Sequence, residues 1–461
     1  MQDLTAGPIT RHLLRTTSFV LVTMLFQTLY ILIDLYWVGR LGTAAVAGVG
    51  IAGNLTFAVL ALTQMIGVGT TTVVSHAVGR KNQDEARVMF NQSQVLAMVT
   101  GFLFLIVGMT FRWPYATAMS ADAETAAMAA DYLKWFIPAM ALQFGIVAMG
   151  SALRAVGNFK PGMVVGSATV VINTILAPFL IFGWVTGRPL GVAGAAISTL
   201  VAVVIGIAWL TTYFLPKDAY LRFDTAGWKP RLALWRRMLS VGLPAGFEFG
   251  ITAVYMALIY TIARPFGPAA QAAFGIGLRI VQAGFIPVLA LGFSVAPVAG
   301  QNFGARLGER VKRTFRDAAW LAAAAMLALS VLCWSIPGTL VSAFSSDPAV
   351  IEMGTEYLRI ISLAFVASGL IFVVSSMFQA MGNTLPSLIS SGVRIGLVAV
   401  SVLFVARMPG FELRWVWWLS VASVYIQLGL SLFLLKREFG RRLSWAPISA
   451  AGSAATEGVR A

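Results

Sequence analysis

Side chains that bind metals or form covalent intermediates are rare in this sequence of 461 residues. It contains one cysteine, Cys333, and two histidines, His12 and His76. A lone cysteine cannot form an intramolecular disulfide or a thiolate cluster, and two histidines are too few for most histidine-rich metal sites. We therefore expect no metal centre and no cofactor, and this composition disfavours an intramembrane enzyme.

Charged residues are also scarce, at 11% of the chain, against about 25% in a typical soluble domain. Hydrophobic residues make up 58%, and the mean hydropathy is +0.82. These values exclude intrinsic disorder and a soluble globular enzyme. A membrane-spanning helix needs about 20 apolar residues, so twelve spans would take about 240 positions.

Continuous apolar runs, separated by charged residues, glycine, proline or asparagine, predict twelve transmembrane helices. The expected spans are 13–38, 46–74, 89–110, 131–154, 161–184, 190–214, 237–263, 269–299, 315–336, 354–379, 385–406 and 414–435. Transmembrane strands would instead alternate in polarity over about 10 residues. The sequence therefore predicts an all-α polytopic membrane protein.

Basic residues exceed acidic ones, which gives a net charge of +15. With twelve spans both termini lie on one side, and most lysines and arginines fall in segments on that side. The positive-inside rule then predicts cytoplasmic termini in a multi-pass protein of the bacterial inner membrane. We expect this charge to set topology and to contact anionic lipid, not to bind nucleic acid.

The chain repeats itself at one fixed offset of 225 residues. GNFKP at 157–161 corresponds to GNTLP at 382–386, and DYLK at 131–134 corresponds to EYLR at 356–359. Loop residues match as well as apolar ones, so low complexity does not explain the repeat. Because each half contains six spans, both halves enter the membrane from the same side and are parallel repeats.

Two parallel repeats predict two six-helix lobes around a central cavity, which is the layout of a transporter with alternating access. A receptor or scaffold would not require such a gap-free repeat. The expected divisions are 1–214 for the N-lobe with spans 1–6, 215–236 for a cytoplasmic inter-lobe linker, 237–443 for the C-lobe with spans 7–12, and 444–461 for a disordered cytoplasmic tail.

Several segments resemble the multidrug and toxic compound extrusion (MATE) family of efflux antiporters. They include YILIDLYWVGRLGTAAVAGVGIA at the exit of the first span, LRAVGNFKP after the fourth, LGVAGAAIST entering the sixth and VAGQNFGA after the eighth. Within this family, the sequence is most similar to the bacterial branch that resembles the DNA-damage-inducible protein F. The resemblance implies an exporter of small organic cations or amphipathic drugs, driven by inward H⁺ or Na⁺, and we expect it to be a monomer.

Two positions depart from the family pattern. Family members often have a proline near the middle of span 1, but RTTSFVLV has none, and the repeat places Phe19 opposite Pro244. Span 5 often reads N-x-x-L-D-P in relatives, whereas NTILAP puts Ala177 at the acidic position. The usual second carboxylate is therefore missing, which leaves both H⁺ and Na⁺ open as the coupling ion.

Asp34 is the main candidate for ion coupling. Thr23, Gln27, Tyr30 and Asp34 are spaced by 4, 3 and 4 residues, so they share one face of span 1. Such a stripe is not expected to face lipid, because a charge within the membrane costs about 2.5–3.5 kcal/mol. We interpret Asp34 as a proton or cation site that is open to the cavity; the alternative is an interfacial acid paired with Arg40.

At the repeat offset, the same stripe places an acid at a different depth. Its residues are Glu248, Thr252, Tyr255 and Ile259. The polar residues expected to line the substrate cavity are Gln27, Tyr30, Glu248, Thr252 and Tyr255. Glu248 would bind a cationic substrate or a second proton there; the alternative is a structural ion pair with Arg279 or Arg394, the two arginines within spans.

Two further polar residues are candidates for the ion-coupling site. The family resemblance implies that Asn173 is a hydrogen-bond partner for Asp34, with Thr199 nearby; the alternative is ordinary hydrogen bonding between helices. His76 is interpreted as a loop residue and not as a proton shuttle. A lipid-linked intermediate flippase of the same superfamily is the alternative function, although such proteins tend to carry many basic residues in the cavity.

Overall fold

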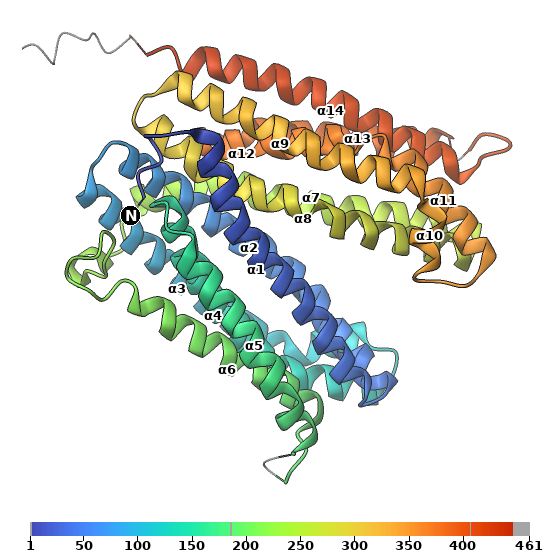
Figure 1. The fold of residues 1–461 in the computed structure, drawn as a ribbon. Coiled ribbons are helices and arrows are strands. Elements are labelled where there is room, and N and C mark those ends of the chain that lie inside the picture. The colour runs from blue at the N-terminus through green and yellow to red at the C-terminus, as the bar shows by residue number, and fades with distance from the viewer. Residues whose placement is uncertain (1, 185–186, 406, 446–461) are drawn as a thin grey trace, which may run out of the picture.

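The computed structural model describes residues 2–184, 187–405 and 407–445, and these are helical nearly throughout (Figure 1). The helices of the first half are α1 (Ile9–Gly39), α2 (Thr43–Gly79), α3 (Gln83–Met119), α4 (Ala123–Ala155), α5 (Lys160–Phe182) and α6 (Gly191–Thr212). Those that follow are η1 (Thr225–Trp228), α7 (Leu232–Ala263), η2 (Arg264–Phe266), α8 (Pro268–Gly304), α9 (Gly308–Ser335), α10 (Pro337–Ser342), α11 (Pro348–Ser362), α12 (Phe365–Met381), α13 (Leu385–Val405) and α14 (Leu413–Arg442).

Within the described residues, 11 helices are long and apolar enough to cross a membrane, and α11 with α12 makes a twelfth if that pair is one span. The expected all-α polytopic membrane fold is therefore confirmed. Most of the expected tail, residues 446–461, lies outside the described residues.

The tenth span differs from the single helix expected over 354–379. The chain bends by 53° between α11 and α12. The break leaves backbone carbonyls without helical partners, and hydroxyl groups of neighbouring helices bond to two of them. Ser330 of α9 donates to the Ser362 carbonyl at 2.8 Å, and Tyr425 of α14 donates to the Leu363 carbonyl at 2.8 Å. Such compensation allows a break inside an apolar bundle.

Short polar side chains begin several of the helices. The Asn82 side chain accepts from the Glu85 amide at 3.0 Å, and Asp122 accepts from the Thr125 amide at 2.8 Å. Both are N-caps, which satisfy amide groups that have no partner within the helix. The hydrogen bonds from the Thr125 amide and hydroxyl lower the pKa of Asp122, as expected for an acid at a helix N-terminus.

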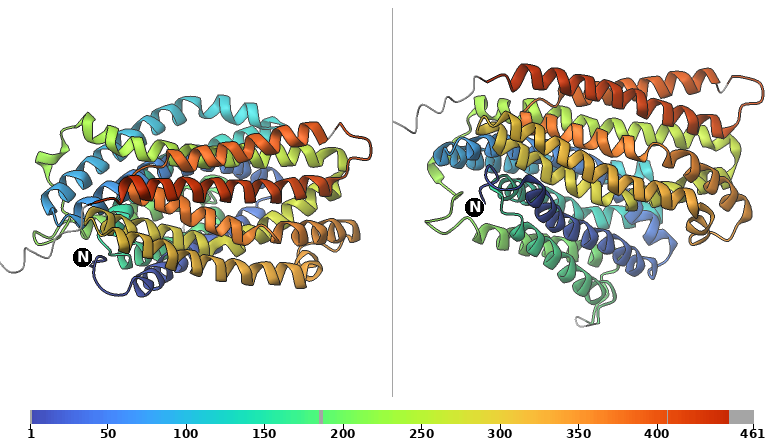
Figure 2. Two further views of the ribbon diagram at one scale, coloured as in Figure 1. Left: turned by 90° about the horizontal axis from the view of Figure 1, so that it is seen from above. Right: turned by 45° about the horizontal axis from the view of Figure 1, so that its top comes forward.

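The helices form two groups, α1–α6 and α7–α14, that meet at the end of the molecule where the N-terminus lies and diverge toward the other end (Figure 1). Figure 2 shows from two further directions that most helices run lengthwise from this end. The contacts between the groups come mainly from α2 against α7 and α8, and from α1 against α8 and α9.

Glycine allows the helices to approach closely where the two groups meet. A Cβ atom added at Gly79 would overlap the Gln301 carbonyl oxygen, and one at Gly242 would overlap the Met65 carbonyl oxygen. The missing side chain lets the backbones of α2, α7 and α8 cross in contact, as small residues do at helix interfaces in membranes.

Hydrogen bonds join the two groups at this same end. The Leu4 amide donates to Gln301 Oε1 at 3.0 Å, and Thr10 donates to Asp317 Oδ2 at 2.7 Å, so α8 and α9 hold the segment around the start of α1. In the other direction, Gln92 of α3 donates to the carbonyls of Gly227 and Lys229, just before α7. Each half is therefore held to the other near the start of its first helix.

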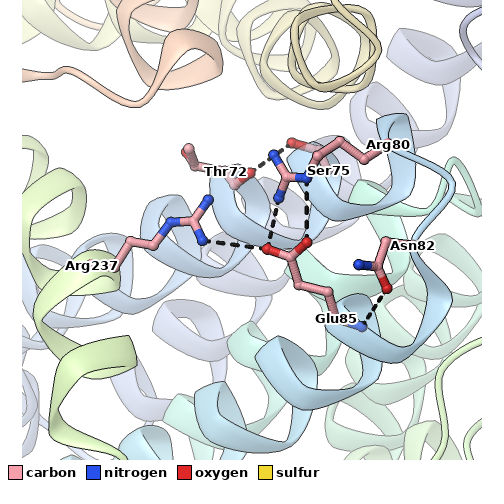
Figure 3. A network of polar contacts seen from close by, with 6 residues as sticks. All are labelled: Thr72, Ser75, Arg80, Asn82, Glu85 and Arg237. Atoms are coloured by element: carbon pink, nitrogen blue, oxygen red, sulfur yellow. Dashed lines mark hydrogen bonds and ion pairs between the residues drawn. The ribbon is translucent and has the colours of Figure 1, made fainter.

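An ion-pair network lies beside this junction (Figure 3). Glu85 at the start of α3 accepts from Arg80 at 2.7 Å and from Arg237 of α7 at 3.4 Å. His76 lies nearby but is not a loop residue as expected: it is buried in the last turn of α2, with Nε2 at 2.6 Å from the Ala380 carbonyl of α12. It therefore belongs to the interface between the halves.

Candidate functional site

Three of the predicted site residues form one polar cluster in the first half. The Tyr30 hydroxyl of α1 lies 3.1 Å from Thr199 Oγ1 of α6. Asn173 of α5 donates to Thr199 Oγ1 at 3.1 Å and to Ser198 Oγ at 3.3 Å. Asn173 and Thr199 are both buried. The structure thus brings Tyr30, Asn173 and Thr199 together and links three helices through them.

Asp34 follows Tyr30 by one helical turn and lies outside this hydrogen-bond chain. Its Oδ1 atom is buried and has no hydrogen-bond partner in the described part of the protein. The expected bond from Asn173 is not formed, because the Asn173 amide donates to Ser198 and Thr199 instead. Nor does Asp34 pair with Arg40, whose guanidinium donates to Tyr36 and lies over the Trp37 ring.

One residue of this site was missed by the sequence reasoning. Tyr132 of α4 is buried, and it is close enough to Asp34 and to Tyr30 for electrostatic interaction with both. The repeat contained a signal for it, since DYLK and EYLR place Tyr132 opposite Tyr357. Asp34 therefore lies beside two tyrosine rings, one of which begins the Thr199–Asn173 chain.

The acid of the second half has a different environment. Glu248 of α7 accepts hydrogen bonds from three serine hydroxyls: Ser387 at 2.9 Å, Ser391 at 3.0 Å and Ser375 at 3.3 Å. Ser375 comes from α12 and the other two from α13. Gln427 of α14 donates in turn to Ser391 at 3.1 Å. This serine cluster (Ser375, Ser387 and Ser391) was not predicted, although SLISS at 387–391 places two serines one helical turn apart.

The ion pair considered for Glu248 is not present. Among the described residues, Glu248 pairs with neither Arg279 nor Arg394, because the serine cluster supplies its donors. Arg279 is exposed on α8. Arg394 of α13 lies over the Tyr255 ring, with its Cζ atom 4.9 Å from the ring centre.

The remaining predicted cavity residues are not part of one cluster. The Tyr255 hydroxyl donates to Ser420 Oγ of α14 at 3.1 Å, which parallels the contact of Tyr30 with α6. Thr252 is exposed and donates to the Glu248 carbonyl of its own helix. Gln27 is exposed on α1. A separate pocket of about 350 Å³ in the second half is lined by Phe274, Tyr357 and Trp417 among others.

A family model matches this chain once in each half. The model is MatE, and it covers residues 20–179 and 244–405. The chain belongs to the MatE family. The two matches agree with the internal repeat, because the same pattern of helices is recognised twice. Among the described residues no group of three or more histidine, cysteine or acidic side chains is arranged to hold a metal ion.

Relatives and solved structures agree over nearly the whole length of this MatE protein. It is 26% identical to the multidrug export protein MepA of Staphylococcus haemolyticus, over 90% of this chain and 91% of that protein. The fold is similar to that of a MOP superfamily transporter from Pyrococcus furiosus, with a TM-score of 0.88, 22% identity, and coverage of 96% and 98%. An outward-facing multidrug resistance MATE transporter gives a TM-score of 0.87 with the same identity and coverage.

Proposed function

We propose that this MatE protein is a secondary active multidrug exporter in which Asp34 carries the coupling ion. It would sit in the bacterial inner membrane with both termini in the cytoplasm and move amphipathic or cationic organic compounds outward. The proposal is supported by the multidrug export relative and, above all, by the buried Asp34 oxygen that has no hydrogen-bond partner among the described residues. A carboxylate in that position is costly unless a proton or cation neutralises it.

A proton fits this site better than Na⁺. A hard cation requires several oxygen ligands at short range, whereas the family's second acid is replaced by Ala177, which is buried. A proton needs only the Asp34 carboxylate itself.

The two halves suggest how the ion flow drives export. With the N-terminus in the cytoplasm, the end at which the two groups of helices diverge would face the outside (Figure 1). A proton entering from outside would neutralise Asp34 and weaken the attraction of the first half for a cationic substrate. Competition between the two cations for one carboxylate would couple their movements, and the cycle would return through separation of the halves at the junction near His76 and Glu85.

The test is export of ethidium from proteoliposomes with an imposed proton or sodium gradient. We expect inward protons to drive wild-type export, and Asp34→Asn to reduce the rate at least tenfold. The matched control is Asp131→Asn, which removes an exposed acid of the same half. Export by Asp34→Asn at the wild-type rate under both gradients would refute the assignment; export driven by sodium alone would refute the choice of proton.

A further inference from the structure

Equivalent tyrosines lie at the charged centre of each half. At the repeat offset of 225, Tyr30 corresponds to Tyr255, and Tyr132 corresponds to Tyr357. Tyr132 lies within electrostatic range of Tyr30 and of Asp34. Tyr357 lies within electrostatic range of Tyr255 and of Arg394. The repeat has therefore kept the same pair of rings in both halves, each beside one charged side chain.

The sign of that charge is reversed between the halves. The position equivalent to Asp34 is Ile259, which is fully buried. The position equivalent to Arg394 is Thr169, whose hydroxyl donates to the Gly166 carbonyl of its own helix. The tyrosine pair thus faces a carboxylate from α1 in the first half and a guanidinium from α13 in the second.

Arg394 has no acidic partner in the described part of the chain. Its Nε atom is buried without a hydrogen-bond acceptor. The Tyr255 ring covers one face of the guanidinium, with its centre 4.9 Å from Cζ, so the edge that carries the N–H donors stays clear of the ring. Glu248 does not reach it, since three serines hold that carboxylate. A partly buried arginine without a counter-charge is unfavourable in a membrane protein, so an anion is the missing partner.

The hydroxyl of the neighbouring tyrosine also has no hydrogen-bond partner in the described part of the protein. Tyr357 is only 5% exposed, yet its hydroxyl makes no hydrogen bond among the described residues. The centre of its ring lies 4.8 Å from that of Trp417, and the ring also packs against Phe274. Tyr357, Trp417 and Phe274 line the pocket of about 350 Å³. The Tyr357 hydroxyl and the Arg394 guanidinium therefore lie near each other, and both can donate hydrogen bonds to the same anionic oxygens.

We infer that Arg394, with Tyr255 and Tyr357, forms a binding site for the carboxylate of an organic anion or zwitterion. The guanidinium would donate two parallel hydrogen bonds to the two carboxylate oxygens, the geometry in which arginine binds planar anions. The Tyr357 hydroxyl would donate a third. That the bound anion is a transported substrate rests on the proposed export function. The site would extend the exported compounds to those that carry a negative group.

Calorimetric titration of the purified protein with benzoate tests this site. Benzamide is the probe's neutral analogue, with the same ring and one oxygen replaced by an amide nitrogen. We expect wild-type protein to bind benzoate at least tenfold more tightly than benzamide, as a charge-assisted bidentate contact requires. Equal affinity for the two compounds in wild-type protein would overturn the inference without any variant.

Variants locate the site. Arg394→Gln should remove the preference for benzoate, whereas Arg394→Lys should keep part of it because the charge remains without the planar fork. The matched control is Arg279→Gln, which removes an exposed arginine of the same half and should leave the preference unchanged. If Arg394→Gln does not fold, Tyr357→Phe should weaken benzoate binding several-fold and leave benzamide unaffected. An unchanged preference in folded Arg394→Gln or in Tyr357→Phe would place benzoate elsewhere.

A phospholipid phosphate offers the same chemistry as a carboxylate, so the titration is made in maltoside micelles and in phosphatidylcholine nanodiscs. If benzoate binds in micelles and in nanodiscs, a soluble carboxylate is the ligand. If benzoate binds in micelles alone, the lipid phosphate occupies the site in nanodiscs, and the carboxylate assignment is overturned. Asp34→Asn should keep full benzoate binding. Failure of the proposed transport mechanism would therefore be distinguishable from failure of this site.

Discussion

Asp34 and Glu248 are both carboxylates on the first helix of their half, yet their surroundings differ. Glu248 accepts hydrogen bonds from three serines, and a glutamine supports one of those serines. Asp34 has a buried oxygen with no partner among the described residues. Hydrogen bonds to a charged group stabilise the charge and hold it in place, whereas an unpartnered buried carboxylate favours taking up a cation.

The different surroundings indicate different roles for Asp34 and Glu248. An acid that must bind and release an ion in every cycle cannot have its charge satisfied permanently by the protein. Glu248, by comparison, ties α7 to α12 and α13 through the serine cluster. The repeated arrangement of helices thus carries different chemistry in its two copies: one half keeps an acid without a partner, and the other uses its acid to hold three helices together.

The largest difference is expected when each acid is replaced by its amide. Asp34→Asn should reduce gradient-driven ethidium export at least tenfold while leaving the folded protein intact, because an amide of similar shape has no carboxyl group that can bind and release the coupling ion. Glu248→Gln keeps an acceptor for the serines and should retain more than a third of the wild-type rate. Rates per molecule of folded protein, measured in proteoliposomes, provide the comparison. A greater loss of transport in Glu248→Gln than in Asp34→Asn would reverse the roles of the two halves.

The sequence was sufficient to predict the class of fold. Apolar runs of the right length predict membrane helices wherever they are continuous. The break between α11 and α12 was not predictable in the same way, because Leu363 and Ala364 are apolar and carry no break signal. The bend depends on hydroxyls from Ser330 and Tyr425, which are distant in sequence and meet the freed carbonyls only in the folded protein.

The candidate site was predictable only in part. Helical spacing placed Tyr30 and Asp34 on one face, and the repeat pointed to Glu248 and Tyr255. The partners could not be deduced, since hydrogen bonding depends on which side chains from other helices reach the same point. Arginine was expected opposite Glu248 on grounds of charge, but the serine cluster satisfies that acid with neutral donors.

A medium effect is expected from removing one serine of the cluster. Ser387→Ala removes the hydroxyl that donates to Glu248 and also contacts Ser375 Oγ, and should destabilise the protein by about 1.5–3 kcal/mol, the range for hydrogen bonds to a charged group. Ser390→Ala is the matched control, because Ser390 is buried in the same helix but donates only to a backbone carbonyl. Thermal unfolding in detergent should show a clearly larger decrease in Tm for Ser387→Ala. Equal decreases would mean that the cluster does not stabilise the Glu248 charge.

The smallest effect, and the sharpest comparison, comes from the equivalent tyrosines. Tyr30 contacts Thr199 of α6 at 3.1 Å, and Tyr255 contacts Ser420 of α14 at 3.1 Å. Replacing either with phenylalanine removes one hydrogen bond between hydroxyls, so each should lower the free energy of unfolding by about 0.5–1.5 kcal/mol. The stability losses of the two variants should match within that range because the two contacts are equivalent.

The transport rates of the two variants should differ. Tyr30→Phe disturbs the hydrogen-bond chain beside Asp34 and should slow proton-driven ethidium export several-fold, whereas Tyr255→Phe leaves that chain untouched. If both variants transport ethidium equally well, the cluster around Tyr30 supports only the packing of α1 against α6, and ion coupling does not depend on it.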